Sequence, residues 1–358
     1  MDAYTGTKPI AAQHEFDHAV LTAYLDAHLD GFKGPLTLEQ FKGGQSNPTF
    51  KLATPGRSYV MRSKPGPAAK LLASAHAIER EFRVMKALQG TAVPVPQMLL
   101  LCEDEAVIGR AFYVMEFMPG RVLWNQSLPD FSNEGRAAIY DEMNRVIAEL
   151  HQIDVAAVGL GTFGKPGNYF ERQIGRWGKQ YLASITEPIE AMAKLMEWLP
   201  ANIPTSARDD GQVSVVHGDF RLDNMMFHPT EPRVIGVLDW ELSTVGHPLA
   251  DFSYHCMSWR IPPGAFRGIG GLDLAALGIP DEQTYVRRYC ERTGRSDPQA
   301  VMADWNFYMA YNLFRMGGIL QGIARRVVDG TASSEQAKQA GAGARPLAEM
   351  GWRIAQQG

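Results

Sequence analysis

The stretch V-H-G-D-F-R-L-D-N at residues 216–224 decides the fold, together with the strand-like run at 234–238 that ends at Asp239. Within it, Asp219 and Asn224 are five positions apart, and Asp239 closes the next predicted hairpin. One carboxylate at such a site can accept the proton of a hydroxyl group. A second carboxylate and an amide oxygen are hard ligands of the kind that Mg²⁺ prefers. The spacing therefore favours a catalytic loop with a metal site over a surface turn capped by an aspartate.

The composition of the 358-residue chain excludes several classes of protein. Of its residues 45% are hydrophobic and 21% are charged, and 35 Lys and Arg against 39 Asp and Glu give a net charge of −4. This near balance, without long runs of one sign, predicts neither nucleic acid nor an anionic membrane surface as a partner. No apolar run approaches the roughly 18 residues that a membrane helix needs. We expect a soluble globular protein with no membrane partner.

The cysteines and the N-terminal residues indicate the compartment. The chain has three widely separated cysteines: Cys102, Cys256 and Cys290. An odd number without metal-ligand spacing predicts neither a disulfide framework nor a thiolate zinc site. Residues 1–11 are polar and lack the basic-then-apolar pattern of a secretory or transit peptide. These features fit a reducing compartment, and we expect a cytoplasmic location.

The character of the sequence changes at Met118-Pro119-Gly120. Before this break, periodicity predicts a leading helix over 14–30 and a helix that Ser74 caps. Strands are predicted in the same part, at 49–52 after a turn cluster at 43–48, and at 58–62, 97–101 and 111–117. After the break helices predominate, at 133–151, in a region with breaks at 169–199, and at 303–328. We therefore expect an α+β fold with a β-rich lobe at 1–117 and a larger helical lobe at 118–358.

Two sets of motifs resemble a known family. His217-Gly218-Asp219 with Asn224, followed by L-D-W-E at 238–241, is similar to the aminoglycoside phosphotransferase and choline kinase family, relatives of the protein kinases. The segments G-G-Q-S-N-P-T-F at 43–50 and Y-V-M-R-S-K-P at 59–65 resemble its branch of domains found beside or fused to acyl-CoA dehydrogenases. The resemblance extends from Phe41 to about Gly330. It implies a bilobal protein-kinase-like fold, with a nucleotide-binding sheet in the first lobe and the catalytic loop and acceptor site in the second.

The resemblance also implies an activity and its residues. The chain would transfer the γ-phosphoryl group of ATP to a hydroxyl of a small molecule, with Mg²⁺ as cofactor. Asp219 would be the catalytic base, and His217 would brace its loop. Asn224, which belongs with Asp219 and His217 to the catalytic loop, would bind the metal together with Asp239. Glu241 resembles an additional acidic residue near the metal, and its role stays open.

A glycine-rich segment would cover the phosphates. Its expected contacts come from Gly43, Gly44, Ser46 and Asn47, because small residues let backbone N–H groups approach anionic oxygen. The chain lacks a G-x-G-x-x-G loop, so an ordinary glycine turn remains the alternative reading of this segment.

A cation and a glutamate are also implied by the resemblance, because kinases pair a strand lysine with a helix glutamate. The matching strand position here is Arg62, and the sequence leaves open whether Arg62 or Lys64 contacts the phosphates. Glu81 is the better partner on the helix, with Glu79 as the alternative.

The remaining implied positions are the nucleotide hinge and a buried aspartate. Glu116 and Met118 would flank backbone groups that receive the adenine. In G-H-P-L-A-D at 246–251, Asp251 would support the catalytic loop from beneath. Tyr254 and Trp259, further along the same helix, have the character of packing residues.

A rival reading uses the same stretch as a metal site. His247, Asp251 and His255 are spaced by four residues and could line one helix face, as in a metal-dependent hydrolase. Against this, Pro248 suits the first turn of a helix, which would leave His247 outside it.

The acceptor is the least determined part of the function. The resemblance suggests a hydroxy acid or a hydroxyacyl-CoA, and Arg315 could meet an acidic group on it. An aminoglycoside or amino-alcohol kinase is an alternative, although the helical half has no acidic cluster for a polycation. A second alternative is a non-catalytic nucleotide-binding protein, since Arg62 stands where a lysine is usual. The expected partners are ATP, the acceptor and, functionally, an acyl-CoA dehydrogenase.

Overall fold

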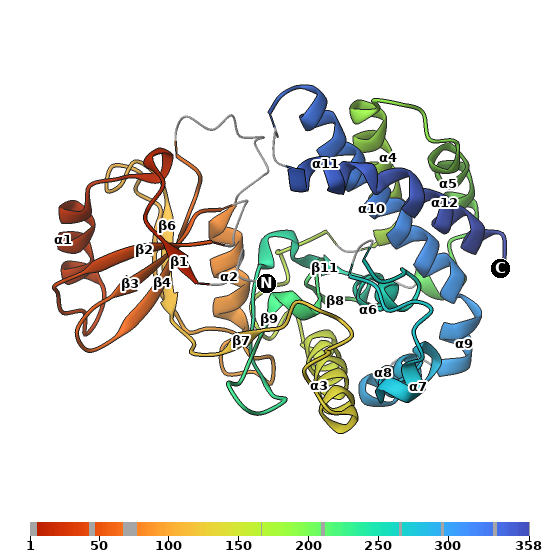
Figure 1. The fold of residues 1–358 in the computed structure, drawn as a ribbon, viewed down its shortest axis with the longest axis horizontal. Helices are drawn as coiled ribbons and strands as arrows, with labels where there is room; N and C mark the ends of the chain where they lie inside the picture. Colours follow the sequence, from red (N-terminus) through yellow and green to blue (C-terminus); the bar gives the residue numbers. More distant parts are fainter. Residues whose placement is uncertain are drawn as a thin grey trace. The chain divides into compact units, whose positions relative to one another are not determined.

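The computed structural model describes residues 6–42, 47–66, 77–165, 167–208, 212–264, 267–294, 297–331 and 335–357. The chain forms two compact units, drawn in sequence colours in Figure 1. Unit 1 consists of Met1–Trp124 and Asp223–Ser243, and unit 2 consists of Asn125–Leu222 and Thr244–Gly358. The units interleave along the chain, because residues 223–243 belong with the N-terminal part. The boundary therefore falls inside the predicted catalytic loop, between Leu222 and Asp223.

Unit 1 contains a six-stranded antiparallel sheet in the order β1-β2-β3-β4-β6-β5. Its strands are β1 (Thr7–Lys8), β2 (Thr37–Phe41), β3 (Thr49–Ala53), β4 (Ser58–Ser63), β5 (Met98–Cys102) and β6 (Phe112–Glu116). Successive residues of these strands point to opposite faces. Phe50, Met61 and Phe112 therefore share a face, and they form one buried cluster with Leu21 and Leu25 of helix α1 (His18–His28).

The first helix is shorter than the periodicity predicts. A 3-10 turn, η1 (Ala12–His14), precedes α1, and Asp17 caps α1 by accepting hydrogen bonds from the backbone N–H groups of Ala19 and Val20. The cap sets the start of the helix at His18, several residues after the predicted start.

Helix α2 (Ile78–Leu88) packs against β5 and β6, on the side of the sheet away from α1 (Figure 1). Its buried stripe is apolar except for Glu81. The strand alternation that turns Met61 toward α1 turns Arg62 toward α2, and the register sets Arg62 opposite Tyr113 of β6. The predicted cap Ser74 lies outside the described residues.

Unit 1 also holds a small sheet in the order β10-β9-β7, formed by β7 (Arg121–Val122), β9 (Met225–Phe227) and β10 (Val234–Val237). After β10 the chain passes through Asp239 into a 3-10 turn, η4 (Trp240–Leu242), which contacts α2. Trp240 is fully buried there, and its indole N–H donates to the carbonyl of Val237 over 2.9 Å. This anchor sets the position of the residues at the end of the hairpin.

Unit 2 is helical around a central helix, α10 (Trp305–Val328). The helices that pack on α10 are α4 (Tyr169–Ser184), α5 (Glu190–Ala201), α6 (Pro248–Cys256), α9 (Pro298–Ala303), α11 (Glu335–Ala342) and α12 (Ala344–Ala355). Unit 2 also holds α3 (Asn133–Gln152), α7 (Leu274–Leu277) and α8 (Glu282–Thr293), with 3-10 turns η2 (Thr205–Arg208) and η5 (Met257–Trp259). The 3-10 turn η3 (Leu222–Asn224) spans the point at which the chain passes from unit 2 to unit 1. The predicted helices at 133–151 and 303–328 are confirmed within two residues.

A two-stranded sheet carries the chain into the predicted catalytic loop. Strand β8 (Ser214–Val216) pairs antiparallel with β11 (Thr244–Gly246), so that the loop begins directly after β8. Gly164 lies against this pair, because a β-carbon on Gly164 would come within 2.7 Å of the backbone nitrogen of Val245. Only a residue without a side chain allows this close approach.

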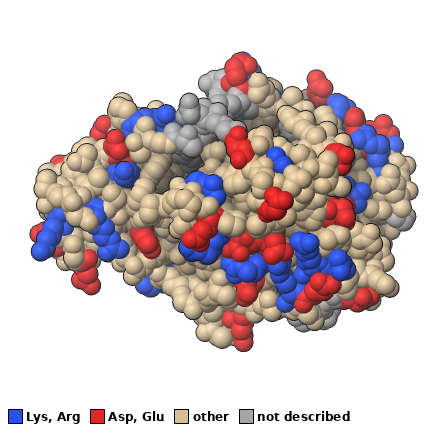
Figure 2. All heavy atoms as spheres, turned by 60° about the horizontal axis from the view of Figure 1, so that its bottom comes forward, with Lys and Arg blue, Asp and Glu red and all other residues tan. Residues whose placement is uncertain are grey.

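The surface agrees with the balanced composition. Figure 2 shows Lys and Arg side chains interspersed with Asp and Glu side chains over the face that it displays. Among the helices within the described ranges, none has the length and apolar character needed to cross a bilayer.

The close approach at Gly164 predicts a stability effect. Gly164→Ala should lower the free energy of unfolding by about 1–3 kcal/mol, because the Val245 backbone must shift to admit the methyl group. Gly161→Ala is the matched control in the same loop, since a β-carbon there meets no atom within 4 Å. Urea denaturation of the three proteins checks the prediction, and equal midpoints for the two variants would contradict it.

Candidate active site

The centre of unit 1 is a buried ion pair between sheet and helix. The Nε atom of Arg62 lies 3.1 Å from Oε2 of Glu81, and their side chains are 10% and 1% exposed. Glu81 also accepts hydrogen bonds from Asn47 Nδ2 over 3.0 Å and from the hydroxyl of Tyr113 over 3.1 Å. A buried carboxylate is stable only when paired and hydrogen-bonded, and here three donors meet that need. Glu81 is therefore the partner of Arg62, as predicted.

The same guanidinium group reaches the end of the β9–β10 hairpin. Its Nη2 atom donates to Oδ1 of Asp239 over 2.8 Å and lies 3.5 Å from Oε2 of Glu241. Burial by itself would lower the pKa of Arg62, but the carboxylates of Glu81 and Asp239 raise it above its usual range. Arg62 is thus a permanently charged group that links β4, α2 and the hairpin within unit 1.

Lys64 has a different partner. Its Nζ atom pairs with Oε1 of Glu79, and both side chains are about a quarter exposed. The two cations and the two glutamates considered from the sequence thus form two separate pairs, one buried and one near the surface. Which cation contacts phosphate stays a prediction.

The end of the hairpin has donors suited to Mg²⁺. Asp239 has φ +66° and ψ +58°, a left-handed conformation that aspartate tolerates better than most residues, and its side chain is one-third exposed. Glu241 is about one-quarter exposed, whereas Asn224 is buried and its backbone carbonyl accepts from the N–H of Leu238 over 2.8 Å. Two carboxylates and an amide oxygen are hard donors, so these residues fit Mg²⁺ in chemical type.

The other predicted nucleotide contacts stay predictions. Gly43, Gly44 and Ser46 lie outside the described residues. Glu116, at the end of β6, exchanges hydrogen bonds with Gln97: its backbone N–H donates to the Gln97 carbonyl, and its carboxylate accepts from the Gln97 N–H. The end of the Met118 side chain lies against Gly236, where a β-carbon would overlap it.

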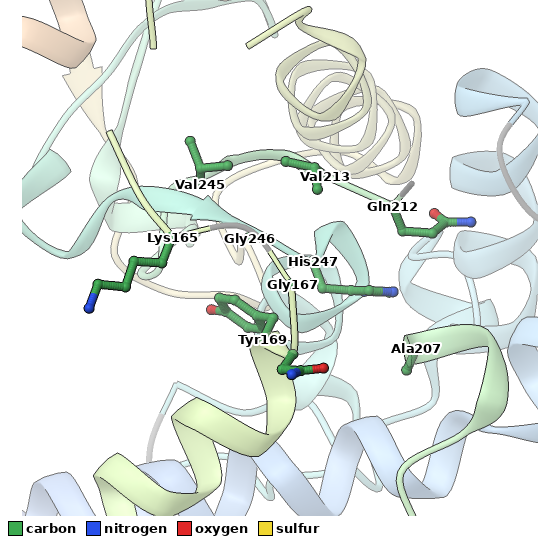
Figure 3. A pocket seen from close by; sticks show the side chains of 10 residues that line it. Lys165, Gly167, Tyr169, Ala207, Gln212, Val213, Val245, Gly246 and His247 are labelled. Carbon is green, nitrogen blue, oxygen red and sulfur yellow. The ribbon is translucent and has the colours of Figure 1, made fainter. Parts of the chain in front are cut away.

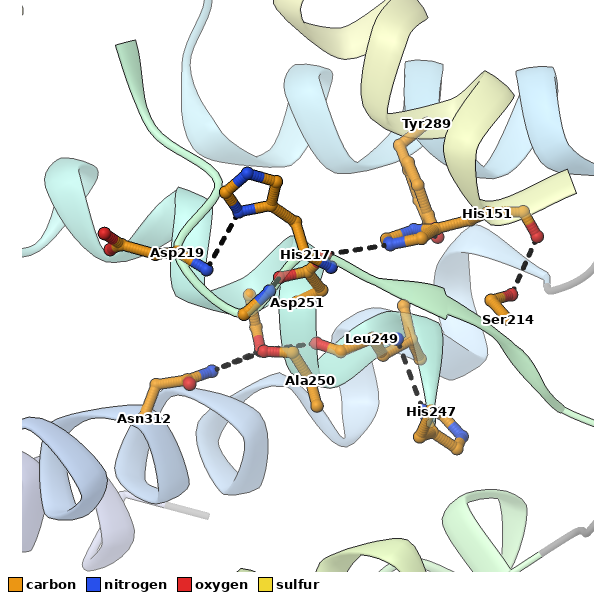
Figure 4. A network of polar contacts seen from close by, with 12 residues as sticks. His151, Ser214, His217, Asp219, His247, Leu249, Ala250, Asp251, Tyr289 and Asn312 are labelled. Atoms are coloured by element: carbon orange, nitrogen blue, oxygen red, sulfur yellow. Dashed lines mark hydrogen bonds and ion pairs between the residues drawn. The ribbon is translucent and has the colours of Figure 1, made fainter. Parts of the chain in front are cut away.

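The catalytic loop of unit 2 is held by Asp251, in the first turn of α6. Asp251 is 1% exposed, and its two oxygens accept from the backbone N–H groups of His217 over 2.7 Å and Gly218 over 2.8 Å (Figure 4). Burial would raise the pKa of Asp251, but the hydrogen bond and charge of His151 and the backbone N–H of His217 lower it. The predicted support of the loop by Asp251 is confirmed.

Further contacts fix the helix and the histidine behind this aspartate. His151 of α3 lies 3.3 Å from the Asp251 carboxylate through Nε2 and 2.6 Å from the Tyr289 hydroxyl through Nδ1. Asn312 of α10 donates to the carbonyl of Ala250 over 3.1 Å (Figure 4). The contact of His151 with Asp251 was not predicted from the sequence, although the position of His151 at the end of a strongly periodic helix was a weak signal.

Asp219 occupies the end of this braced loop. Its backbone N–H donates to Nδ1 of His217 over 3.1 Å, and its Oδ2 atom lies 3.1 Å from Nη2 of Arg221. The Asp219 side chain is 16% exposed, so it is reachable from solvent. The ring of His217 is thus bonded to the backbone of Asp219 within the loop, and its part in catalysis stays a prediction.

Two residues have other contacts than the sequence indicated. Tyr254 is a packing residue that also donates a hydrogen bond from its hydroxyl to Oδ1 of Asp219. Arg315 is buried and donates to the carbonyl of Gly218 over 2.5 Å, so its guanidinium group is engaged with the loop rather than presented to an acidic acceptor. Tyr254 follows Asp251 by three residues on α6, and this helical spacing was the available signal.

The rival three-ligand metal site is wrong. His247 caps α6 by accepting from the Leu249 N–H over 3.2 Å, Asp251 binds the loop, and His255 Nε2 lies 2.8 Å from the Tyr285 hydroxyl. Within the parts of the chain that the structure describes, no group of three His, Cys, Asp or Glu residues is arranged to hold a metal.

A small cavity in unit 2 does not serve as the acceptor site. Figure 3 shows side chains around it, among them Tyr169, Gln212 and His247. The space has room for little more than one water molecule, which excludes a ligand of metabolite size.

The two glutamates of α2 should differ sharply in their contribution to stability. Glu81→Gln should lower the free energy of unfolding by about 3 kcal/mol, because the amide leaves the buried Arg62 without its charged partner on α2. Glu79→Gln, the matched control, should cost less than about 1 kcal/mol, since its pair with Lys64 is partly exposed. Urea denaturation measures both, and similar losses in the two variants would contradict the assignment.

Comparison with known proteins agrees with this geometry. The sequence model of the family described as "Phosphotransferase enzyme family" matches residues 37–292. Acyl-CoA dehydrogenase family member 10 of Mus musculus is 44% identical over 352 residues, which cover 98% of this chain and 32% of that protein. The chain thus spans about a third of the length of this curated relative.

Two solved structures are similar over nearly all of the chain. A provisionally named aminoglycoside phosphotransferase from Ralstonia eutropha has a TM-score of 0.87 and 63% identity, covering 96% of this chain and 99% of that one. Choline kinase from Cryptosporidium parvum has a TM-score of 0.66 and 10% identity, covering 95% and 97%, which shows the fold alone. The predicted kinase-like fold is therefore confirmed, and the chain belongs to the phosphotransferase enzyme family.

Proposed function

We propose that this phosphotransferase moves the γ-phosphoryl group of ATP to the hydroxyl of an acidic small molecule, a hydroxy acid or a hydroxyacyl-CoA, with Mg²⁺ as cofactor. The class of the enzyme, a small-molecule kinase acting on a hydroxyl group, follows from the family. The donor, the metal, the acceptor and the residue roles are the content of the proposal.

The contacts of Arg62 support the donor side of the proposal. A buried cation that contacts Glu81 and Asp239 is suited to bind the phosphates of a nucleotide, as the strand lysine does in other kinases. Asp239 and Asn224 would hold the metal, with Glu241 nearby in sequence as a further carboxylate. Mg²⁺, when bound, supplies charge neutralisation for the transferred phosphoryl group.

The braced loop supports a base at Asp219. The acceptor hydroxyl would attack the γ-phosphorus, the bond from that phosphorus to ADP would break, and the hydroxyl proton would pass to Asp219. Asp251 accepts hydrogen bonds from two successive backbone N–H groups of the loop, those of His217 and Gly218. These bonds fix the backbone position from which the Asp219 side chain extends. Holding the reacting groups in place before the reaction supplies much of the rate enhancement in phosphoryl transfer.

The positive charge next to Asp219 is the observation that supports an acidic acceptor. Arg221, 3.1 Å from the Asp219 carboxylate and partly exposed, places a positive group beside the hydroxyl to be phosphorylated. Because Arg221 offsets the charge of Asp219, an ammonium group of choline or an aminoglycoside would find no net negative charge here, whereas a carboxylate or phosphate on the acceptor would avoid the repulsion of a lone aspartate. The acyl-CoA dehydrogenase name of the mouse relative agrees with this choice and suggests a functional association with such an enzyme.

One observation favours a non-catalytic alternative. Asp239, the expected metal ligand, is engaged by Arg62 in this structure. A protein in which this contact persisted with nucleotide present would bind ATP without turnover. The acceptor experiment decides between the two readings, because only the enzyme consumes ATP when a hydroxyl substrate is added.

An ATP-consumption assay with Mg²⁺ tests the acceptor class. Hydroxy acids and hydroxyacyl-CoAs with the hydroxyl at different carbons are compared with choline, ethanolamine and kanamycin at equal concentration. We expect turnover with an acidic acceptor and a lower kcat/KM with every cationic one. Turnover confined to the cationic compounds would overturn the acidic acceptor, and no turnover despite Mg²⁺-dependent ATP binding would establish the non-catalytic alternative.

Two aspartate variants test the residue roles. Asp219→Ala should lower kcat by about 10²–10⁴-fold with unchanged ATP affinity, because it removes only the base. Asp239→Ala should weaken Mg²⁺-dependent ATP binding itself, measured by calorimetry. Asp130→Ala, at an exposed position of unit 2, is the control for loss of a surface carboxylate. Near wild-type turnover in Asp219→Ala would refute the base assignment.

A further inference from the structure

Both oxygens of the Asp219 carboxylate have side-chain partners within unit 2. Oδ1 accepts a hydrogen bond from the hydroxyl of Tyr254, and Oδ2 lies 3.1 Å from Nη2 of Arg221. A carboxylate on a loop can otherwise turn about its side-chain bonds. Because each oxygen has a partner, the contacts with Tyr254 and Arg221 fix the plane of the Asp219 carboxylate.

Tyr254 comes from the helix that also holds the loop backbone. It lies on α6, three residues after Asp251, and it is 6% exposed. Residues three apart share a helix face, so one face of α6 contacts the loop twice. Asp251 fixes the backbone at His217 and Gly218, and Tyr254 fixes the carboxylate of the residue that follows them.

Arg315 of α10 contacts the ring of Tyr254. Its guanidinium carbon lies 4.9 Å from the centre of the Tyr254 ring and 5.5 Å from that of Trp177, and its Nη2 donates to the Gly218 carbonyl. A desolvated cation over aromatic faces is a favourable and directional contact. Arg315 thus restrains both the phenol ring and the carbonyl of the residue immediately before Asp219.

We propose that Tyr254, backed by Arg315, is a positioning residue that holds the Asp219 carboxylate in the orientation required by the acceptor hydroxyl. The inference rests on the proposed function, because it assumes that Asp219 is the base. Tyr254 gives the Asp219 carboxylate a neutral hydrogen-bond donor that comes from α6, outside the catalytic loop.

The chemistry of a phenol suits this part. Burial, and after it the negative charge of Asp219, raise the pKa of Tyr254, so its hydroxyl remains protonated and can only donate to the carboxylate. A carboxylate oxygen has two lone-pair sites, and Tyr254 uses one of those on Oδ1. Tyr254 thus orients the Asp219 carboxylate by a bond to one of its two oxygens.

Tyr254→Phe tests the proposal by removing one oxygen atom and keeping the ring over Arg315. With Mg²⁺, ATP and the best acceptor of the panel, kcat should fall about tenfold, the rate equivalent of one hydrogen bond to a charged group. The KM for ATP should not change, because Arg62, Glu81 and Asp239 belong to unit 1. Wild-type kcat in this variant, or a change confined to the KM for ATP, would overturn the proposal.

Tyr140→Phe is the matched control. Tyr140 is also fully buried in unit 2, but its hydroxyl donates to the carbonyl of Gln126 over 2.7 Å and not to the loop. A merely structural effect of losing a buried phenol hydroxyl would lower kcat equally in both variants, and that result would refute the positioning role. Arg315→Lys keeps the charge and loses the planar fork, so it should lower kcat and leave the KM for ATP unchanged.

A second measurement does not depend on the acceptor. In protein labelled with ¹³C at the aspartate carboxyl carbons, the signal lost in Asp219→Asn identifies Asp219. This signal should move in Tyr254→Phe and stay in place in Tyr140→Phe. An unmoved signal in Tyr254→Phe would overturn the inference. Failure of the proposed function is distinct from this, because it would appear as absent turnover in the wild-type protein.

Discussion

The buried carboxylate of Asp251 is the contact on which the rest of the catalytic loop depends. A fully buried charge is costly unless each of its oxygens is compensated. Here two successive backbone N–H groups and His151 compensate it, and those same bonds force the chain after β8 into one conformation. The same hydrogen bonds therefore stabilise the core and set the position of Asp219. Loss of the carboxylate would free the loop and leave buried donors unpaired.

Unit 1 uses the opposite arrangement, a buried cation surrounded by carboxylates. Arg62 contacts Glu81 in the core and Asp239 near the surface, so one guanidinium group joins a structural partner to a group expected to meet Mg²⁺. Arg62 makes the two contacts from different nitrogens of its planar fork, Nε and Nη2, whereas a lysine would have to reach both carboxylates from one nitrogen atom. Arginine at this position therefore differs from lysine in the distance that it can span as well as in shape.

Periodicity and motifs in the sequence predicted those features of the structure that depend on residues within one element or one motif. The long helices follow from periodicity, and the pair of Arg62 with Glu81 and the support from Asp251 follow from the resemblance of the motifs to those of the family. The contacts of Tyr254 and Arg315 were not predictable in the same way. Each depends on how α6 and α10 pack on the loop, and an aromatic or cationic residue on a buried face has the same pattern whether it fills space or binds a neighbour. Likewise, no periodicity indicates that residues 223–243 belong to unit 1.

This interleaving has a consequence for how the chain acquires its structure. A ribosome releases the six-stranded sheet of unit 1 well before residues 223–243, so the nascent sheet holds Arg62 without Asp239, and β7 has no strand to pair with. The long-range pairing between β7 and β9 must wait until about a hundred intervening residues have emerged, and closing so long a loop slows folding. Residues 1–124 alone hold neither the strand that pairs with β7 nor Asp239. An excised fragment of these residues would keep the pair of Arg62 with Glu81, and it would need the later hairpin, joined by a linker, to regain Asp239 as the second carboxylate.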